Sequence, residues 1–399
     1  MSSTELPGIR AAAAAVAPTV SAVRVAAGER LRSVELAGLT LTLRSRPSRG
    51  PGLPPALFVH GLGGSSQNWT ALMPLLEERV DCEAVDLPGF GDSPPPDDGN
   101  YSVTGHARAV IRLLDAQERG PVHLFGNSLG GAVATRVAAV RPDLVRTLTL
   151  VSPALPEIRV QRSAAPTALL ALPGVASLFA RLTRDWTAEE RTRGVMALCY
   201  GDPARVSDTG FRDAVAEMER RLELPYFWDA MARSARGIVD AYTLGGQHGL
   251  WRQAERVLAP TQLVYGGRDQ LVSFRMARRA SAAFRDARLL TLPDAGHVAM
   301  MEYPEAVAQA FRTPRTSSRP PVHGRSYRAP GASSSRRSTT RSPHRPLRAG
   351  GARRPPTRTA RSPTGRRARR RSGATRTRSR PRIPGAARGG RSPVSPPPR

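Results

Sequence analysis

Residues 122–131 read VHLFGNSLGG, an apolar run that leads directly into a serine framed by glycines. The next residues, 132–139, read AVATRVAA and favour a helix. A G-x-S-x-G pattern between a strand and a helix is typical of a sharp turn that lifts a serine hydroxyl, here that of Ser128, into a cleft. A side chain at either outer glycine would collide with the neighbouring strand or helix. Since the pattern also arises by chance, its context decides what it means.

The basic residues are unevenly distributed along the 399-residue chain. A formal net charge of +28 by itself suggests a nucleic-acid-binding protein. Residues 312–399 contain 26 of the 60 basic residues, all of them arginine, and no acidic residue. Residues 1–311 contain 34 basic and 32 acidic residues and are nearly neutral. Nucleic acid is therefore not an expected partner of residues 1–311 and could be bound only through the C-terminal part.

Short apolar runs alternate with helical patterns after an initial hairpin. The hairpin is expected over residues 33–44, where two alternating stretches flank Gly38. Helical patterns such as 103–118 and 273–284 separate most of the later runs. This order predicts an α/β fold with a doubly wound, mostly parallel sheet. Continuous apolar runs typical of strands buried on both faces lie at 56–59, 82–85, 122–125, 148–151, 263–265 and 288–292.

One connection between expected strands is too long for a simple crossover. Residues 152–260 span about 110 residues, whereas a crossover with its helix needs about 10 or more. Helix-like segments occur at 169–182, 208–222 and 226–241. We therefore expect a helical cap over the strand ends. Five of its residues are expected to face an apolar surface, namely Leu169, Leu172, Leu178, Phe179 and Leu182.

The expected domains follow from these patterns. A flexible or partly helical leader (1–32) is followed by the first part of the core (33–154), the cap (155–250), the second part of the core (251–311) and a tail (312–399). The tail is rich in Arg, Pro, Ser, Thr and Gly and is expected to be disordered.

Two interpretations of the tail remain open. It is either a genuine basic arm that binds polyanions through phosphate contacts or an out-of-frame translation that begins near Arg312. The second is motivated by the loss of every acidic residue within a helix that starts at Pro304 and soon meets Pro314.

Several common kinds of site are not indicated. Cys82 and Cys199 suggest neither a disulfide framework nor a metal cluster, and no metal or cofactor is expected. The alanine-rich stretch at 11–17 is weakly hydrophobic, and Glu5 lies where a signal peptide carries positive charge. No stretch approaches the roughly 20 strongly apolar residues that span a bilayer. We expect a cytoplasmic protein without a membrane span; the oligomeric state cannot be predicted.

A serine hydroxyl needs a base to accept its proton, and the base needs a carboxylate to orient it. His297 lies on a loop directly after the last expected strand, and Asp269 follows an earlier strand and a glycine turn. Asp294 is a rival to Asp269 only by its proximity in sequence. The order Ser128, Asp269, His297 is the one expected when a serine turn of this kind lies on an α/β sheet.

Acyl transfer also needs backbone N–H groups that stabilise a developing oxyanion. Residues 60–64, His-Gly-Leu-Gly-Gly, follow the buried run at 56–59 and could turn their amides toward the serine. The expected donors are the N–H groups of Leu62 and Leu129. Alone this run is weak evidence, but its position relative to the serine, acid and base makes the combination specific.

With these residues identified, the chain resembles the α/β-hydrolase superfamily over about residues 33–311. The resemblance implies that Ser128 is the nucleophile, His297 the acid and base, and Asp269 its partner. It also implies that residues 86–93 form a loop with a structural rather than a catalytic role. The short final helix is the departure from the pattern of the family. The matching segments are 60–64, 68–69, 86–93, 126–131, 267–269 and 296–297.

The resemblance implies a serine esterase acting on a small or medium apolar acyl substrate. A serine rather than an aspartate at the turn argues against dehalogenases and epoxide hydrolases. One alternative is a C–C bond hydrolase, because the serine turn with Asn127 before the serine resembles that of some C–C hydrolases. The other is a cofactor-free haloperoxidase-like enzyme. A protein that only binds a ligand, or that binds polyanions through its tail, is the non-enzymatic alternative.

Overall fold

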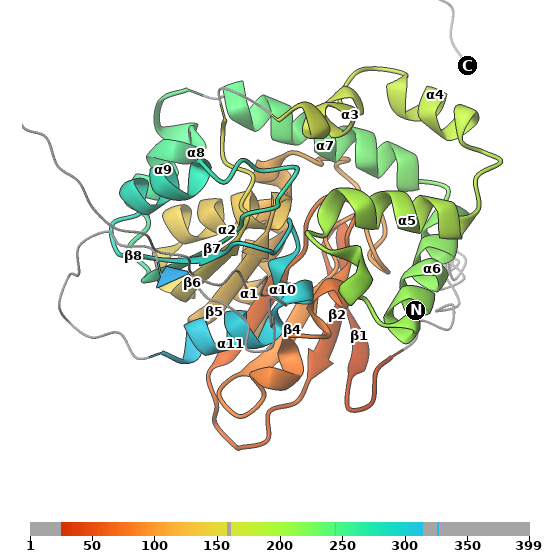
Figure 1. The fold of residues 1–399 in the computed structure, drawn as a ribbon. Coiled ribbons are helices and arrows are strands. Elements are labelled where there is room, and N and C mark those ends of the chain that lie inside the picture. Colours follow the sequence, from red (N-terminus) through yellow and green to blue (C-terminus); the bar gives the residue numbers. More distant parts are fainter. Residues whose placement is uncertain (1–24, 158–160, 244, 314–324, 327–399) are drawn as a thin grey trace, which may run out of the picture. The chain divides into compact units, whose positions relative to one another are not determined.

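A computed structural model describes residues 25–157, 161–243, 245–313 and 325–326 (Figure 1). Its strands pair in the order β1-β2-β4-β3-β5-β6-β7-β8-β9. β2 is antiparallel to β1 and β4, and the other neighbours are parallel, which confirms the predicted fold class. The strands are β1 (Arg30–Leu36), β2 (Leu39–Arg46), β3 (Pro55–Val59), β4 (Asp81–Val85), β5 (Val122–Asn127), β6 (Val145–Val151), β7 (Thr261–Gly266), β8 (Ala287–Leu292) and β9 (Arg325–Ser326).

The first hairpin starts earlier than expected. β1 begins at Arg30, within the segment assigned to the leader, and Arg30 pairs with Ser45 of β2. A buried ion pair of 2.8 Å between Glu29 and Arg44 holds this end of the hairpin. The pattern of alternating residues predicted too short a strand because Arg30 and Arg32, near the start of β1, are charged. Residues 1–24 of the expected leader lie outside the described residues.

Helices cover both faces of the sheet and bury two apolar cores. Successive residues of a strand point to opposite faces, so Leu57 and Val59 of β3 join one core while Ala56 and Phe58 join the other. α1, α2, α8 and α9 contribute to the first core, and α10 and α11 with two short 3-10 helices to the second. These elements are α1 (Val103–Gln117), α2 (Leu129–Val140), α8 (Leu250–Arg256), α9 (Met276–Ala283), α10 (Ala299–Glu302), α11 (Pro304–Arg312), η1 (Ser66–Trp69) and η2 (Met73–Leu75).

Between β6 and β7 the chain forms the cap helices, which lie at the top and right of Figure 1. The helix expected over residues 169–182 is wrong as a single element, because the chain breaks at Pro173 and Gly174, whose φ is +77°. The cap helices are α3 (Ala165–Leu169), α4 (Val175–Leu182), α5 (Ala188–Cys199), α6 (Asp208–Glu223) and α7 (Phe227–Thr243).

The expected burial of five apolar cap residues is also wrong. α3 and α4 pack along α7, and α4 buries only Ala176. The apolar side chains on the other sides of these helices contact solvent, although Phe179 also packs edge-on against Trp186 and Trp228, with ring centroids 6.4 and 5.6 Å away. The five residues expected to be packed are exposed by 39–72%: Leu169, Leu172, Leu178, Phe179 and Leu182.

The final helix, α11, is short and lies over β5. Phe311 near its end packs at a tilt against Phe125 and edge-on against His123, with ring centroids 5.2 and 5.1 Å apart. The helix ends at Arg312. Residues 314–324 and 327–399 lie outside the described part, so both interpretations of the tail stay predictions.

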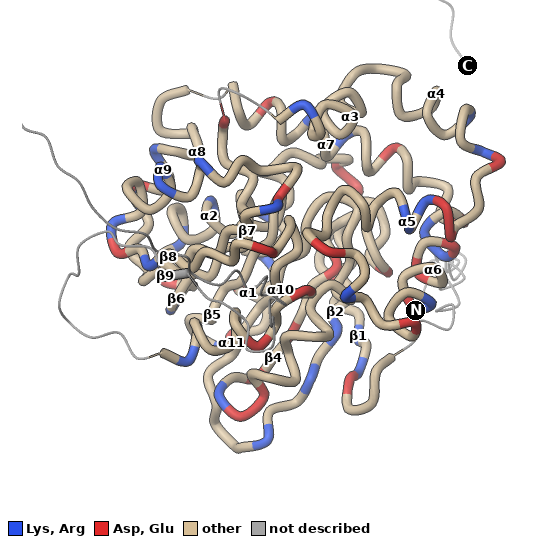
Figure 2. The backbone as a smooth tube through the Cα atoms, in the orientation of Figure 1, with Lys and Arg blue, Asp and Glu red and all other residues tan. Residues whose placement is uncertain are grey.

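Charges of both signs are interspersed over the described chain, as its near-neutral balance predicts (Figure 2). None of its helices is both long enough and apolar enough to cross a membrane. The same residues contain no group of three or more His, Cys, Asp or Glu side chains arranged to hold a metal ion.

Candidate active site

The strand order reverses between β3 and β5, which are neighbours in the sheet. From β3 the chain continues to β4 on one side, whereas β5 lies on the other, so the order of the strands switches direction here. The carboxyl ends of the strands at such a switch point are where open α/β sheets bind ligands. Val59 of β3 is in register with Gly126 of β5. The loops that begin at His60 and Asn127 therefore start side by side.

Ser128 stands at a strained turn between β5 and α2. Its backbone has φ 54° and ψ −117°, a conformation that side chains rarely adopt and that costs about 1–3 kcal/mol. Glycines make the turn possible, because a Cβ at Gly126 would lie 2.4 Å from the carbonyl oxygen of Gly130. A Cβ at Gly130 would lie 2.3 Å from the carbonyl oxygen of Val59. Both outer positions therefore require glycine, for the steric reason expected from the pattern.

The turn after β3 lies against Ser128, since a Cβ at Gly61 would be 3.1 Å from the Cβ of Ser128. The carbonyl oxygen of Gly61 accepts hydrogen bonds from the Gly64 N–H (3.0 Å) and from His60 Nδ1 (2.7 Å). The C=O and N–H of a trans peptide point in opposite directions, so the N–H of Leu62 points away from both partners.

Leu62 and Leu129 keep their N–H groups available. Leu129 is the first residue of α2, and the N–H groups of a first helical turn have no partner within the helix. Among the described residues, neither the Leu62 nor the Leu129 N–H donates a hydrogen bond to the backbone. Both donors adjoin the turn at Ser128, where an anionic oxygen could accept from them.

His60 is a structural histidine. Its Nε2 accepts a hydrogen bond from the Leu87 N–H (2.9 Å), which leaves the proton on Nδ1 to be donated to the Gly61 carbonyl. Burial lowers the pKa of His60 to about 4, so the ring is neutral at pH 7. A neutral ring with both nitrogens engaged fixes the loop and is not free to act as a base.

Asp269 and His297, which follow β7 and β8, meet at the same end of the sheet. His297 Nδ1 lies 3.0 Å from Asp269 Oδ2 and 3.2 Å from Oδ1, and both residues are buried. The Leu271 and Val272 N–H groups donate to Asp269 Oδ1 at 2.8 and 2.9 Å. Burial alone would raise the pKa of Asp269, but His297 and the hydrogen bond from the Val272 N–H hold it below its usual value. The carboxylate is thus ionised and oriented toward the imidazole.

Asp294 does not take this place. Its carboxylate is 60% exposed and pairs with Arg268 at 2.9 Å. Asp269 is the carboxylate that contacts the His297 ring, although Asp294 is much closer to His297 in sequence.

Asn127 connects the serine turn with the histidine loop. Its buried side-chain amide donates to the backbone carbonyls of Val151 (3.1 Å) and His297 (3.0 Å). The residue before Ser128 is therefore bonded directly to the residue that the sequence suggests as the base. In the described part of the chain no hydrogen bond joins the Ser128 hydroxyl to the His297 ring.

Comparison with known proteins identifies the fold family. Residues 56–310, more than half of the chain, match the sequence model of the alpha/beta hydrolase family. The chain belongs to the α/β hydrolase family.

Two curated relatives illustrate the range of this family. The chain is 30% identical over 272 residues to the dihydrolipoyllysine-residue acetyltransferase component of the acetoin cleaving system of Pseudomonas putida, covering 65% of this chain and 63% of that protein. It thus spans less than two thirds of that relative's length. It is 27% identical to the pimeloyl-[acyl-carrier protein] methyl ester esterase of Neisseria meningitidis serogroup B, covering 67% of this chain and 95% of that protein.

A solved structure agrees at the level of the fold. The meta-cleavage product hydrolase from Pseudomonas fluorescens has a TM-score of 0.56 and 21% sequence identity, covering 70% of this chain and 97% of that chain. At this identity the likeness shows the shared α/β hydrolase fold alone.

Sequence reasoning missed one residue that shapes the site of this α/β hydrolase, Glu302. Its buried carboxylate accepts from the N–H groups of Gly296 (2.6 Å), Gly201 (2.9 Å) and Asp202 (3.2 Å). Burial raises the pKa of Glu302, although these hydrogen bonds oppose the rise. Glu302 thereby joins the loop that carries His297 to the segment of the cap that follows α5. A glutamate five residues after the histidine was the only signal in the sequence.

Proposed function

We propose that this α/β hydrolase is a serine esterase that cleaves a carboxylic ester of a small to medium apolar acyl substrate through an acyl-enzyme, without a cofactor. The observation that carries the proposal is the buried Asp269–His297 pair, held beside the strained turn at Ser128 by the Asn127 amide. A binding protein would need neither the strained serine nor the oriented pair.

In the first half of the reaction, Ser128 Oγ attacks the ester carbonyl carbon and its proton passes to His297 Nε2. The carbonyl oxygen becomes negatively charged and accepts hydrogen bonds from the Leu62 and Leu129 N–H groups. Asp269 stabilises the imidazolium that forms. The tetrahedral intermediate then collapses, His297 donates the proton to the leaving alkoxide, and an alcohol departs.

In the second half, water replaces the alcohol. His297 Nε2 accepts a proton from the water as its oxygen attacks the acyl carbon, and the same two N–H groups bind the oxyanion. Collapse returns the proton to Ser128 Oγ and releases a carboxylic acid. The cycle begins when the Ser128 hydroxyl donates a hydrogen bond to His297 Nε2, and hydrogen bonds of this kind are often loose before substrate binds.

Apolar side chains beside the loop after β3 support an apolar acyl group. Leu62 and Met231 of α7 pack against the first core, and a Cβ at Gly63 would lie 2.9 Å from the sulfur of Met231. The esterase from Neisseria meningitidis acts on a methyl ester by its name, which supports a carboxylic ester as the substrate class here.

The two alternative reactions have no specific support in the structure. The non-enzymatic alternative, polyanion binding, concerns a different part of the chain. Asn127 suggested a C–C bond hydrolase, but its amide is used by two backbone carbonyls and so does not distinguish the two reactions. The haloperoxidase-like reading has no specific observation in its favour. Polyanion binding would use the tail, which lies outside the described residues.

The test is covalent labelling with a fluorophosphonate probe combined with hydrolysis of p-nitrophenyl acetate and butyrate. We expect both reactions in the wild type and neither in Ser128→Ala, where the loss in kcat should reach about 10⁶-fold because the nucleophile is gone. Ser177→Ala, an exposed serine on α4, serves as the control and should behave as the wild type. Equal activity in Ser128→Ala would refute the proposal.

A further inference from the structure

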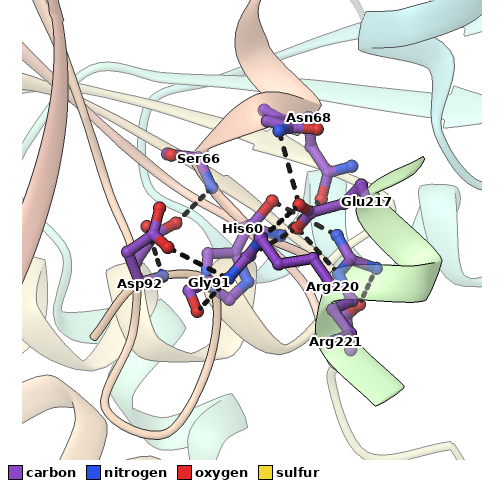
Figure 3. Close-up of polar contacts among 12 residues, drawn as sticks. His60, Ser66, Asn68, Gly91, Asp92, Glu217, Arg220 and Arg221 are labelled. Atoms are coloured by element: carbon purple, nitrogen blue, oxygen red, sulfur yellow. Dashed lines mark hydrogen bonds and ion pairs between the residues drawn. The ribbon is translucent and has the colours of Figure 1, made fainter. Parts of the chain in front are cut away.

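Cap helix α6 contacts the loop after β3 through a buried arginine (Figure 3). Arg221 Nη1 donates to the carbonyl oxygen of Gly63 at 2.6 Å, and its Nη2 donates to Ser65 Oγ at 3.2 Å. The Arg221 side chain is only 12% exposed. Hydrogen bonds from a cation are about twice as strong as neutral ones, so this contact restrains the loop beside Ser128.

Glu217 holds this arginine in place. Its Oε1 accepts from Arg221 Nε at 2.9 Å, and its two oxygens accept from Arg220 Nη2 and Nε, each at 2.9 Å. The Glu217 side chain is 5% exposed. One buried carboxylate thus orients two neighbouring guanidinium groups and leaves their other donors directed at the core.

Arg220 uses its remaining donors at a different loop. Its Nη1 bonds the carbonyl oxygen of Gly91 (3.1 Å) and Asp92 Oδ1 (3.0 Å). This contact docks α6 on the core but does not reach residues 60–64. Arg220 and Arg221 therefore share a helix, a partner and a degree of burial, and they differ in which loop they hold.

A chain of hydrogen bonds leads from Arg221 to Leu62 through two peptide groups. The Gly63 carbonyl accepts from Arg221, and the N–H of the same peptide group, that of Gly64, donates to the Gly61 carbonyl at 3.0 Å. The N–H of that second peptide group belongs to Leu62. Hydrogen bonds in series polarise one another, so a cation at one end increases the positive charge on the N–H at the other.

We propose that Arg221 is a positioning residue of the oxyanion hole, which orients and polarises the Leu62 N–H through the peptide groups of residues 61–64. Glu217 fixes Arg221, and the position of the cap thereby sets the strength of one oxyanion donor. The inference rests on the proposed function, since it requires a negatively charged oxygen to form beside Leu62.

The experiment compares Arg221→Met with Arg220→Met, its matched control. Each variant is titrated with the fluorophosphonate probe, so that kcat is expressed per active site. The substrates are p-nitrophenyl butyrate and its thionoester, in which sulfur replaces the carbonyl oxygen. Sulfur is a weak hydrogen-bond acceptor, so thionoester hydrolysis depends less on the oxyanion donors.

We expect Arg221→Met to lower kcat for the ester by about 10- to 100-fold, below the full loss of one donor, with KM changed less than about threefold. The ratio of ester to thionoester rates should fall in Arg221→Met and stay unchanged in Arg220→Met. Arg221→Lys, which can still donate a charged hydrogen bond to Gly63, should recover most of the ratio. A role limited to docking the cap would not move this ratio.

The possible failures are distinct. A wild type that neither takes the probe nor hydrolyses the ester overturns the proposed function and this inference with it. An active wild type with the same ester-to-thionoester ratio in Arg221→Met overturns the inference alone. If Arg221→Met does not fold, Arg221→Gln replaces it; a wild-type ratio in this neutral variant equally overturns the inference.

Discussion

Two helices of the cap, α4 and α6, distribute their side chains in opposite ways. α4 exposes apolar residues: Leu178 is 54% exposed and Leu182 is 72% exposed. In contrast, α6 buries a charged residue, since the side chain of Glu217 is only 5% exposed. α4 contacts α7 within the cap, while α6 reaches the core through Arg220 and Arg221. The contrast teaches that α6 attaches this side of the cap to the core through charged side chains as well as through the apolar Phe211 and Ala214, whereas among the described residues α4 makes no such charged contact with the core.

The contacts that Arg220 and Arg221 make with the core fix how α6 is oriented on it. Apolar packing tolerates sliding between surfaces, whereas a guanidinium bonded to one carbonyl oxygen fixes both the distance and the direction of the contact. A buried ion pair adds little net stability compared with apolar residues, but breaking one is costly. We therefore expect substitutions in α6 and α4 to differ sharply in their effects.

The largest effect is expected from Glu217→Ala. Removing this carboxylate leaves two guanidinium groups without their buried partner, and the free energy of unfolding should fall by about 3–5 kcal/mol. The control is Glu189→Ala on α5, which breaks an exposed pair with Arg193 and should cost less than about 1 kcal/mol. Urea unfolding measures both, and equal losses would remove the contrast between buried and exposed pairs.

A smaller loss of stability is expected when the pH is lowered. Burial raises the pKa of Glu217, but Arg221 and Arg220 outweigh it and lower the pKa to about 2, against 4.5 for a free glutamate. Because the folded-state pKa is depressed, the stabilisation is complete above about pH 4.5 and is lost as the pH falls toward 2.

Glu217→Gln cannot titrate and isolates this contribution. The difference in unfolding free energy between the wild type and Glu217→Gln should shrink by about 2–3 kcal/mol between pH 6 and pH 2. Thermal unfolding across that range measures it. A difference that does not depend on pH would mean that Glu217 is not ionised in the fold.

The smallest effect is expected on α4. Leu178→Ser and Leu182→Ser should each change the free energy of unfolding by less than about 0.5 kcal/mol, since both side chains already contact water. Met196→Ser on α5, where the side chain is 7% exposed, should cost about 2–5 kcal/mol. A loss above 2 kcal/mol in either α4 variant would show that this surface is covered in solution.

These differences also explain what could be predicted from the sequence. The strands and the turn at Ser128 depend on local patterns, namely short continuous apolar runs and glycines where backbones approach closely, and both are visible in the chain. The pairing of Asp269 with His297 could be predicted because the carboxyl ends of parallel strands lie at the same edge of the sheet. The catalytic roles of these residues stay predictions until the labelling experiment is done.

The cap could not be predicted in the same way. Leu178, Phe179 and Leu182 have the spacing of a buried helical stripe, but whether another element covers a stripe is decided by tertiary contacts. Glu217 has arginines three and four residues later, which is the usual spacing of solvated surface pairs. Nothing local distinguishes such a pair from one that is buried against the core.

The contact between Gly201 and Gly296 has a consequence for how sequences of this kind can change. A Cβ on Gly296 would lie 2.3 Å from the backbone nitrogen of Gly201, and a Cβ on Gly201 would lie 2.3 Å from the carbonyl oxygen of Asp294. Neither glycine can be replaced unless the cap segment and the histidine loop move apart together. In evolution the two positions are therefore expected to vary as a pair, and a substitution at one should be tolerated only in chains that have already changed at the other.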